Sequence, residues 1–410
     1  MTENVFDVLT ERGFIEQVSD AEGVRAAVER PISCYVGFDP SATSFHVGNL
    51  VPIMALAQMQ RHGHRPIAVI GGGTGMVGDP SGKTEMRKLL SVEQIDANLV
   101  NLKAQIANLL DFSEGRALMV NNADWLRPLN YLEFLRDIGR HFSVNRMLAA
   151  EAYRTRYESE AGLNFLEFNY MLLQAYDFLH LFREHGCVLQ AGGNDQWGNI
   201  LAGVDLIRRV DGQQAYAITY PLVTTNSGAK MGKTAAGAVW LDQDLVSPFE
   251  YYQYWINTED ADVERFLAIF TFLPMDQVRA LGRQSGADIR QSKEVLAFEA
   301  TRILHGEAAA RAAQDASRQL FGAGLATDAV PTAELDMTVL EAGILAPELF
   351  EQVGLCRSRS EARRLIQQGG AYINDKLVTS ADERITSAYL RDGAILLRAG
   401  KKRYYRIVAR

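Results

Sequence analysis

The stretch from Cys34 to Asn49, which reads CYVGFDPSATSFHVGN, constrains the possible fold more than any other part of the chain. Its first four residues, 34–37, are typical of a short buried strand, because aromatic and β-branched side chains suit a pleated, half-buried surface. Asp39 and Pro40 predict a turn. The apolar run from Leu50 to Met59 has the length of a helix. The stretch is therefore predicted to form a strand, a loop and the N-terminus of a helix.

A helix N-terminus in this position indicates a site for an anion. Its exposed backbone N–H groups and the positive end of its dipole both attract negative charge. Gly48 falls where the helix begins, and its lack of a side chain lets a bulky ligand approach the backbone. Taken alone, the stretch fits an ordinary strand–helix unit with a short polar loop equally well.

Composition is typical of a globular protein of two or three domains. The chain has 410 residues, of which 47% are hydrophobic and 22% charged. We find neither an export signal at the N-terminus nor 18 apolar residues in a row, so we expect a cytoplasmic protein. The three cysteines, Cys34, Cys187 and Cys356, are far apart and lack the C-x-x-C spacing of zinc sites. We therefore expect no metal held by the protein alone.

Charge is distributed unevenly along the chain. Residues 351–410 contain 13 Lys and Arg against 6 Asp and Glu, a net charge of +7, whereas the remainder has a net charge of −15. A basic tail on an acidic body predicts contact with a polyanion, most often nucleic acid. The alternative is a domain that happens to be basic.

A second predicted strand, Arg65–Ile70, leads into the Gly-rich loop 71–84. The loop has the GxGxxG spacing of dinucleotide-binding folds, but that fingerprint needs a helix to open at once, which Pro80 disfavours. It also resembles a Walker phosphate loop, but Val77 stands where that motif requires Gly. What remains is a loop that ends in the carboxylate of Asp79, with Lys83 and Arg87 on the predicted helix that follows.

The segment from Phe165 to Glu184 predicts one long buried helix that ends at Gly186. Tyr170, Gln174 and Asp177 share one face of it, because their spacing is i, i+4 and i+7. A buried Asp without a partner costs several kcal/mol, roughly the cost of an unpaired interior charge. The face therefore contacts either a polar network or a ligand.

Two further strands, Cys187–Gln190 and Ala215–Ile218, are followed by polar loops. The loop after the second, residues 226–234, places Lys230 and Lys233 among glycines, which predicts a mobile cationic clamp; a solvated loop is the alternative. Repeated strand–helix units predict an α/β fold with a doubly wound, Rossmann-like parallel sheet and a cleft at the carboxyl ends of its strands.

The domains expected from these patterns follow one another along the chain. The last of them contains a helix capped by Ser358 and Glu361, a hairpin that begins at 371–373 and turns at 374–375, and a second hairpin at 394–408. In order, we expect a catalytic domain at 1–222, a mobile lysine loop at 223–247, an all-helical domain at 248–325, an acidic linker at 326–345 and a basic α+β RNA-binding domain at 346–410.

Five motifs together resemble a known family. GFDPSATSFHVGN and KMGKT resemble the two ATP signatures of class I aminoacyl-tRNA synthetases, and between them GDPSGK, YMLLQAYDF and GGNDQWGN are similar to the bacterial tyrosyl-tRNA synthetases. The basic tail is similar to the RNA-binding module that ends those enzymes, so the resemblance covers essentially the whole chain.

The resemblance implies a tyrosine–tRNA ligase. Such an enzyme activates L-tyrosine with ATP, releases pyrophosphate, and transfers tyrosine from the adenylate to the 3′ end of tRNA(Tyr). Mg²⁺ arrives with ATP. The resemblance also implies a homodimer, for which the apolar helical stretch from Leu132 to Met147 offers a surface, although an internal helix pair is an alternative.

The resemblance assigns roles to individual residues. Those implied for tyrosine are Tyr35 and Asp177 on the phenol, Tyr170, Gln174 and Asp79 on the ammonium group, and Gln196 near the carboxylate. Those implied for ATP are Gly37, Asp39, Ser41, His46, Gly48, Asn49, Gly193 and Asp195, with Lys83, Arg87, Lys230 and Lys233 on the departing pyrophosphate. Of these, His46, Asn49 and the four cations are the implied catalytic residues. Those implied for RNA are Arg357, Arg359, Arg363, Arg364, Lys401, Lys402 and Arg403.

One position departs from the family pattern. The first signature most often has His at its fourth position, where this chain has Asn49. An amide still donates a hydrogen bond, so we expect activity without proton transfer there. Three other functions remain as alternatives: a dinucleotide-dependent oxidoreductase, an RNA-binding protein with an inactive catalytic domain, and the related synthetase for tryptophan, which would not be expected to have the basic tail or Asp177.

Overall fold

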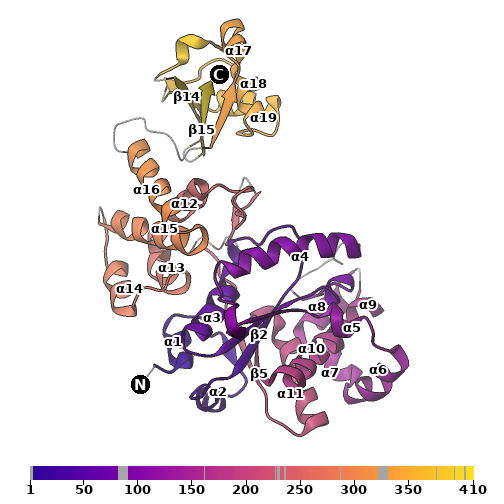
Figure 1. Ribbon diagram of the computed structural model, residues 1–410. Coiled ribbons are helices and arrows are strands. Elements are labelled where there is room, and N and C mark those ends of the chain that lie inside the picture. The colour runs from indigo at the N-terminus through magenta and orange to yellow at the C-terminus, as the bar shows by residue number, and fades with distance from the viewer. Residues whose placement is uncertain are drawn as a thin grey trace. The chain divides into compact units, whose positions relative to one another are not determined.

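The computed structural model describes residues 3–81, 91–160, 162–226, 228, 231–234, 237–286, 288–321, 331–374, 376–391, 393–400 and 403–410. The chain divides into two compact units, each described here by itself. The first unit comprises Met1–Asp242 and Glu259–Ile289, and the second comprises Gln243–Thr258 and Arg290–Arg410. Figure 1 shows the elements with their labels.

The first unit is built on a sheet whose described strands follow the order β1-β6-β5-β2-β3-β4. Every neighbouring pair is parallel except β1 with β6. The order places β2 between β5 and β3, so the chain leaves the middle of the sheet in both directions, which confirms the predicted doubly wound fold. The strands are β1 Gln17–Val18, β2 Ser33–Phe38, β3 Arg65–Ile70, β4 Leu118–Asn121, β5 Cys187–Gly193 and β6 Tyr216–Tyr220.

Helices cover this sheet because its central strands are apolar on both faces. Ile67 through Ile70 of β3 are all buried, which requires apolar cover on each side. Figure 1 shows α10 and α11 beside the sheet, where they contact β5. The helices of this part are α1 Val5–Glu11, α2 Ala21–Ala27, α3 Leu50–Arg61, α4 Val92–Ala107, α5 Ala123–Leu126, α6 Tyr131–Asp137, α7 Val144–Ala149, α8 Glu151–Glu158, α9 Phe165–Phe168, α10 Tyr170–His185 and α11 Trp197–Asp211.

The single helix predicted from Phe165 to Glu184 is instead two. α9 ends at Phe168 and α10 begins at Tyr170. Between them the Tyr153 hydroxyl accepts a hydrogen bond from the Met171 N–H and lies within 3.0 Å of the Phe168 carbonyl. A side chain that inserts between backbone groups in this way interrupts a helix. The predicted end is confirmed, because Gly186 caps α10 with φ 60°.

The helices between 248 and 321 divide between the two units. They are α12 Pro248–Ile256, α13 Val263–Phe270, α14 Met275–Gly282, α15 Ile289–His305 and α16 Glu307–Phe321. The buried guanidinium of Arg12 donates to the carbonyls of Ala268 and Thr271, at 2.8 and 3.1 Å, and thereby fixes α13 to the first unit. The boundaries expected for the helical domain, 248–325, therefore do not coincide with the compact units.

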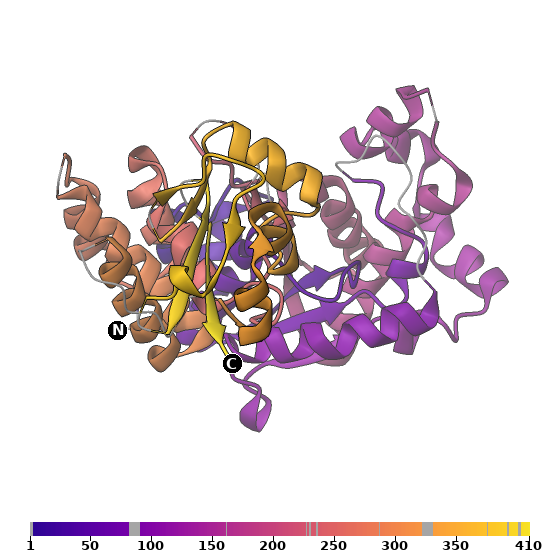
Figure 2. The same ribbon diagram turned by 90° about the horizontal axis from the view of Figure 1, so that it is seen from above.

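The C-terminal part of the second unit is a mixed sheet, in the order β12-β11-β14-β15-β9, with helices α17 Met337–Ala342, α18 Ala346–Gln352 and α19 Arg359–Gln367 (Figure 2, orange to yellow). The strands of this sheet are β9 Thr332–Leu335, β11 Ala371–Ile373, β12 Lys376–Leu377, β14 Ala394–Ala399 and β15 Arg403–Ala409. β10 Ile344–Leu345 and β13 Arg384–Ile385 pair with each other in a separate sheet. Both predicted hairpins are present, as β11–β12 and β14–β15. Ser358 caps α19 as expected, but the Glu361 carboxylate accepts from the Arg357 N–H rather than from that of Ser358.

The linker expected over 326–345 needs correction in its described part. Residues 332–345 form β9, α17 and β10, and β9 pairs in parallel with β15. Leu335 and Leu340 are buried in the core of this domain. Within the described part, the acidic residues Glu334, Asp336 and Glu341 are exposed; Asp336, for example, caps α17 by accepting from the Thr338 N–H.

Candidate active site at the strand ends

Asp177, on α10, has two partners at the end of the sheet. Its Oδ1 accepts from Trp125 Nε1 at 2.7 Å and its Oδ2 from Asn122 Nδ2 at 2.9 Å. Burial raises the pKa of Asp177 to about 7, although the two hydrogen bonds act to lower it. The polar network considered from the sequence therefore exists, and the sequence reasoning missed Trp125 as a member of it. The one feature of the local sequence that pointed to this network was the pair Asn121 and Asn122 after the apolar residues 117–120.

Tyr35 lies near this carboxylate with its hydroxyl unsatisfied. Its Oη is buried and has no hydrogen-bond partner among the described residues. Its ring meets the Phe178 ring edge-on at 5.4 Å. Burial raises the pKa of Tyr35 well above its usual value, and the charge of Asp177 raises it further. A buried hydroxyl without a partner costs roughly 1–3 kcal/mol, so this position indicates a site for a polar ligand.

Further buried oxygens without a partner among the described residues belong to Gln174 on α10, Gln190 on β5 and Asn199 on α11. Gln190 lies directly beside Tyr35 in the register of β5 and β2. The sequence reasoning selected Gln174 but neither of the other two. Tyr170, one turn before Gln174, is also buried. Unsatisfied acceptors therefore lie on α10, which also contains Asp177, and on β5 beside Tyr35.

Asp79 joins the loop after β3 to the beginning of α11. Its Oδ2 accepts from Gln196 Nε2 at 2.6 Å and its Oδ1 from the Ser81 N–H at 2.9 Å. Asn199 Nδ2 completes the network by donating to Gln196 Oε1 and to Ser81 Oγ, both at 3.2 Å. The structure thus brings together Asp79 and Gln196, which lie far apart in the sequence.

The glycines after β3 allow close packing. A Cβ on Gly72 would lie 2.2 Å from Asn121 Oδ1, and one on Gly71 would lie 3.0 Å from Asp39 Oδ1. The N–H of Gly73 donates to Asn122 Oδ1 at 2.8 Å. A 3-10 helix of three residues, Thr74–Met76, follows, where a dinucleotide fingerprint needs an α-helix. These glycines thus hold the loop against Asn121, which ends β4, and Asn122, which follows it.

In the first signature, His46 and Asn49 cap the turn that leads into α3. The N–H of Gly48 donates to His46 Nδ1 at 3.0 Å, and the N–H of His46 donates to Asn49 Oδ1 at 3.1 Å. Asn49 therefore holds the same turn as His46, and its oxygen is already engaged. A Cβ on Gly48 would come within 2.8 Å of the His46 ring, which explains the glycine.

The second signature packs against the first. The N–H of Val239 donates to the Gly232 carbonyl at 2.8 Å, and the N–H of Val47 donates to the Val239 carbonyl at 2.9 Å. A Cβ on Gly232 would lie 3.0 Å from the Gly48 nitrogen. Lys83, Arg87 and Lys230 lie outside the described residues, and Lys233 is described only as backbone, in β7 Lys233–Thr234.

The other residues expected to contact ATP lie at the ends of β2 and β5, which are neighbours in the sheet. Gly37 is in β2, and Gly193 ends β5. Asp195 is exposed just beyond Gly193, and Ser41 is exposed in the loop after β2. The structure therefore brings Gly37, Asp39, Gly193 and Asp195 to one edge of the sheet.

The arginines expected to bind RNA are exposed around α19. Arg363 and Arg364 are exposed on this helix, whereas Arg359 pairs with Glu348 at 2.7 Å and with Glu351 at 3.0 Å. Arg357 is exposed before the helix, and Arg403 Nη1 donates to the Leu355 carbonyl at 2.8 Å. Lys401 and Lys402 lie outside the described residues.

The described part of the chain contains neither a candidate membrane span nor a candidate metal cluster. No helix there is long and apolar enough to cross a membrane. The same residues contain no group of three or more His, Cys, Asp and Glu side chains that could hold a metal ion.

Comparison with known proteins gives consistent results. Residues 27–322 match the family described as "tRNA synthetases class I (W and Y)", and residues 325–407 match the "Tyrosine--tRNA ligase SYY-like C-terminal domain". The chain is 57% identical to the tyrosine–tRNA ligase of Desulfosudis oleivorans, over 99% of each chain. It is 54% identical to that of Caldanaerobacter subterraneus subsp. tengcongensis, over 99% of this chain and 100% of the relative.

Among solved structures, the fold is similar to a C-terminally truncated mitochondrial tyrosyl-tRNA synthetase of Aspergillus nidulans. The TM-score is 0.71 and the identity 31%, with 78% of this chain and 94% of the other covered. The similarity to synthetases therefore holds for sequence and for fold.

Proposed function

The chain belongs to the tyrosine–tRNA ligase family of class I tRNA synthetases, and we propose that its strand-end residues bind tyrosine and ATP and catalyse the family's reaction. The observation that carries this assignment is the unsatisfied hydroxyl of Tyr35 near the carboxylate of Asp177. A substrate phenol placed between them donates its O–H to Asp177 and accepts from Tyr35. Phenylalanine offers neither bond.

The other end of the amino acid lies against the network of Asp79. Its ammonium group binds the carboxylate of Asp79, the hydroxyl of Tyr170 and the unsatisfied oxygen of Gln174. Gln196, which donates to Asp79, faces the substrate carboxylate. Opposite charges attract strongly in a site of low polarity, and this attraction fixes the substrate with its carboxylate toward ATP.

The first chemical step needs positioning more than proton transfer. The tyrosine carboxylate is ionised at neutral pH and attacks the α-phosphorus of ATP in line; one carboxylate oxygen bonds to phosphorus as the bond to pyrophosphate breaks. His46 faces the phosphates from the N-terminus of α3, where the positive end of the helix dipole favours negative charge. Asn49 holds the turn and transfers no proton.

Cationic side chains stabilise the charge that develops on pyrophosphate, which lowers the barrier only if they bind it more tightly in the transition state. These are Lys83, Arg87, Lys230 and Lys233, assigned here from the sequence motifs. Mg²⁺ enters with ATP as part of the substrate and neutralises its phosphates.

The second step consumes tRNA(Tyr). A ribose hydroxyl at its 3′ end attacks the carbonyl of tyrosyl-adenylate, and AMP leaves. The basic C-terminal domain holds the tRNA through its exposed arginines, because most of the affinity for nucleic acid comes from phosphate contacts. Protein synthesis places this reaction in the cytoplasm.

The active form is a homodimer. Leu132 on α6 is 73% exposed and Val144 on α7 is 56% exposed, which favours a covered surface over the internal helix pair that the sequence left open. Phe165 on α9, at 68%, adds to the exposed apolar residues of the first unit. Exposed apolar groups of this size mark interaction surfaces when they are contiguous.

Tyrosine-dependent exchange of pyrophosphate into ATP tests the assignment. The chain should exchange with tyrosine and not with tryptophan or phenylalanine. Tyr35→Phe should raise the KM for tyrosine and leave the KM for ATP unchanged, because it removes only the hydroxyl near the phenol. Binding of tRNA without exchange would instead indicate an inactive RNA-binding protein, and a change in nicotinamide absorbance would indicate an oxidoreductase.

A further inference from the structure

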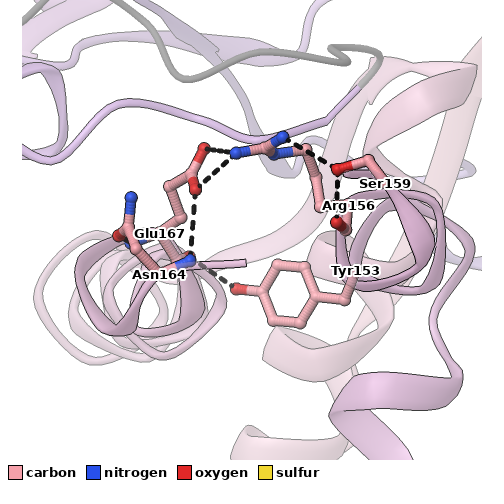
Figure 3. Close-up of polar contacts among 5 residues, drawn as sticks. All are labelled: Tyr153, Arg156, Ser159, Asn164 and Glu167. Atoms are coloured by element: carbon pink, nitrogen blue, oxygen red, sulfur yellow. Dashed lines mark hydrogen bonds and ion pairs between the residues drawn. The ribbon is translucent and has the colours of Figure 1, made fainter. Parts of the chain in front are cut away.

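A buried ion pair joins α8 to α9, outside the residues assigned to substrates. Arg156 Nη2 donates to both carboxylate oxygens of Glu167, at 3.2 and 2.9 Å, and both side chains are 2% exposed. Figure 3 shows this pair with its neighbours. Removing one member of such a pair leaves an uncompensated buried charge, whereas replacing both by apolar groups is often neutral. The pair is therefore a rigid connection rather than a reliable source of stability.

The same carboxylate fixes the beginning of α9. Its Oε2 lies 3.4 Å from the Asn164 nitrogen, while the Glu167 N–H donates to Asn164 Oδ1 at 2.9 Å, which forms a capping box. The orientation of α9 thus depends on both Asn164 and Arg156 (Figure 3).

One turn before Arg156, Tyr153 contacts the joint between α9 and α10. Its hydroxyl oxygen accepts from the Met171 N–H at 2.8 Å, and its O–H points to the carbonyls of Phe168 and Glu167, at 3.0 and 3.2 Å. Tyr170, which we assign to the substrate ammonium, lies in the chain between Phe168 and Met171 and is the first residue of α10. Tyr153 therefore sets where the first turn of α10 lies.

α8 also reaches the beginning of α11, next to the Gln196 side chain that donates to Asp79. Burial is the main cause that raises the pKa of Tyr153, and the charge of Asp79 raises it further. At the beginning of α8, Ala150 Cβ would lie 3.2 Å from a Cβ on Gly198, in the first turn of α11. Gln196 immediately precedes that turn. One helix thus adjoins the beginnings of α10 and α11.

We propose that Tyr153, held in place by the Arg156–Glu167 pair, is a positioning residue that sets the ammonium-binding end of the tyrosine site. The inference rests on the proposed function. Tyr153 acts through α10, because its hydroxyl is spent on the backbone of Met171 and Phe168. Loss of the hydroxyl shifts Tyr170 and Gln174 relative to Asp79 and weakens tyrosine binding equally in the ground and transition states.

Such uniform weakening has a kinetic signature. It raises the KM for tyrosine while kcat stays unchanged. In pyrophosphate exchange, Tyr153→Phe should raise the KM for tyrosine about fivefold to tenfold, the range for one or two lost hydrogen bonds. The KM for ATP and kcat per active site, counted by adenylate titration, should match the wild type.

The control lies near the other end of α10. Arg183 forms a two-bond pair with Asp211, at 2.9 and 2.6 Å, but it is half exposed and distant in sequence from the α9–α10 joint. Arg183→Met removes a comparable pair from α10, and the KM for tyrosine should stay at its wild-type value.

A second variant separates positioning from stability. Replacing both Arg156 and Glu167 by Met removes both buried charges and preserves much of the volume, so the thermal midpoint should return close to that of the wild type. The KM for tyrosine should nevertheless be higher than that of the wild type, because α9 loses its connection to α8. A stable double variant with wild-type KM overturns the role of the pair.

The outcomes distinguish this inference from the proposed function. Exchange by the wild-type chain tests the function itself. A wild type that exchanges, together with a Tyr153→Phe variant of unchanged tyrosine KM, overturns only the positioning role. A variant that loses active sites at unchanged KM shows that Tyr153 serves folding alone, and this result also overturns the inference.

Discussion

The indole N–H of Trp125 donates to Oδ1 of Asp177 across 2.7 Å. Together with Asn122 on the other oxygen, this bond fixes the carboxylate plane at the end of the sheet, so that the remaining lone pairs define where a substrate O–H is accepted. The precision of the proposed phenol site therefore depends on residues that contact no substrate.

The raised pKa of Asp177 predicts a particular pH dependence of stability. In the unfolded chain the group titrates near 3.8, and in the folded protein the pKa is about 7. Between these values the folded state holds a proton that the unfolded state has released, so the contribution of Asp177 to the free energy of unfolding falls as pH rises from about 4 to 7 and is constant above that. Asp177→Asn should remove this fall.

Urea unfolding of both proteins without tyrosine, at intervals from pH 5 to 8, measures the effect. As pH rises to about 7, the free energy of unfolding of the variant should increase relative to that of the wild type, and above pH 7 the difference should be constant. A difference that does not change with pH would show that the carboxylate is ionised throughout this range.

Tyr35 and Asp177 predict strong rejection of phenylalanine. A site built around a hydroxyl leaves its polar groups unpaired when the ligand lacks one. The expected ratio of kcat/KM is about 10⁵, a magnitude taken from tyrosyl-tRNA synthetases themselves, which are the standard example of this effect. Pyrophosphate exchange with each amino acid measures the ratio, and activation of phenylalanine within tenfold of tyrosine would sink the assignment.

We predict that Lys233 affects the rate of adenylate formation and not the binding of tyrosine. If it contacts pyrophosphate only as that group leaves, Lys233→Ala should slow adenylate formation by at least tenfold and hardly change the affinity for tyrosine. Single-turnover kinetics and equilibrium binding measure the two quantities. Equal losses in both would mean that the loop has a structural role.

Removal of the basic domain should separate the two half-reactions. A cut near Ala346, the boundary expected from the sequence, would detach β9 from its partner β15, so we place the cut after Phe321. Adenylate should still form, whereas transfer to tRNA should fall. Because each lost phosphate contact lowers the slope of log affinity against log salt by roughly 0.7–0.9, the truncated chain should also bind tRNA with a shallower salt dependence.

A milder variant keeps the domain folded. Arg363→Ala with Arg364→Ala removes two exposed charges from α19, and the matched control removes Arg25 and Arg116, two exposed arginines of the first unit. Only the first variant should reduce the salt slope of tRNA binding. Equal slopes in both would assign the basic surface to another role.

If the proposed dimer forms through the exposed apolar residues, one charge on α6 should disrupt it. Leu132→Asp should place an unpaired carboxylate in the interface, which costs several kcal/mol, roughly the cost of burying an unpaired charge. Sedimentation should then show the monomer mass at micromolar concentration. Val100→Asp, on α4 and similarly exposed at 66% against 73%, is the control. A monomeric wild type would exclude the dimer.

The sequence alone determined many of the local elements and the family motifs that contribute to the site. Arg65–Ile70 was predicted with the bounds that β3 has, and both C-terminal hairpins were predicted at their turns. Such features are encoded by side-chain periodicity and turn residues within a few positions, which is why they can be predicted from a single chain. The family motifs likewise depend on short stretches.

Only the tertiary structure decided which groups became partners. Trp125 lies 52 residues before Asp177, and Gln196 lies 117 residues after Asp79; no local pattern relates them. The break at Asn169 depends on Tyr153 from another helix, and β9 depends on β15 at the far end of the chain. A buried polar group gains stability only when a partner satisfies it, and strand order and helix packing bring that partner from any distance along the chain.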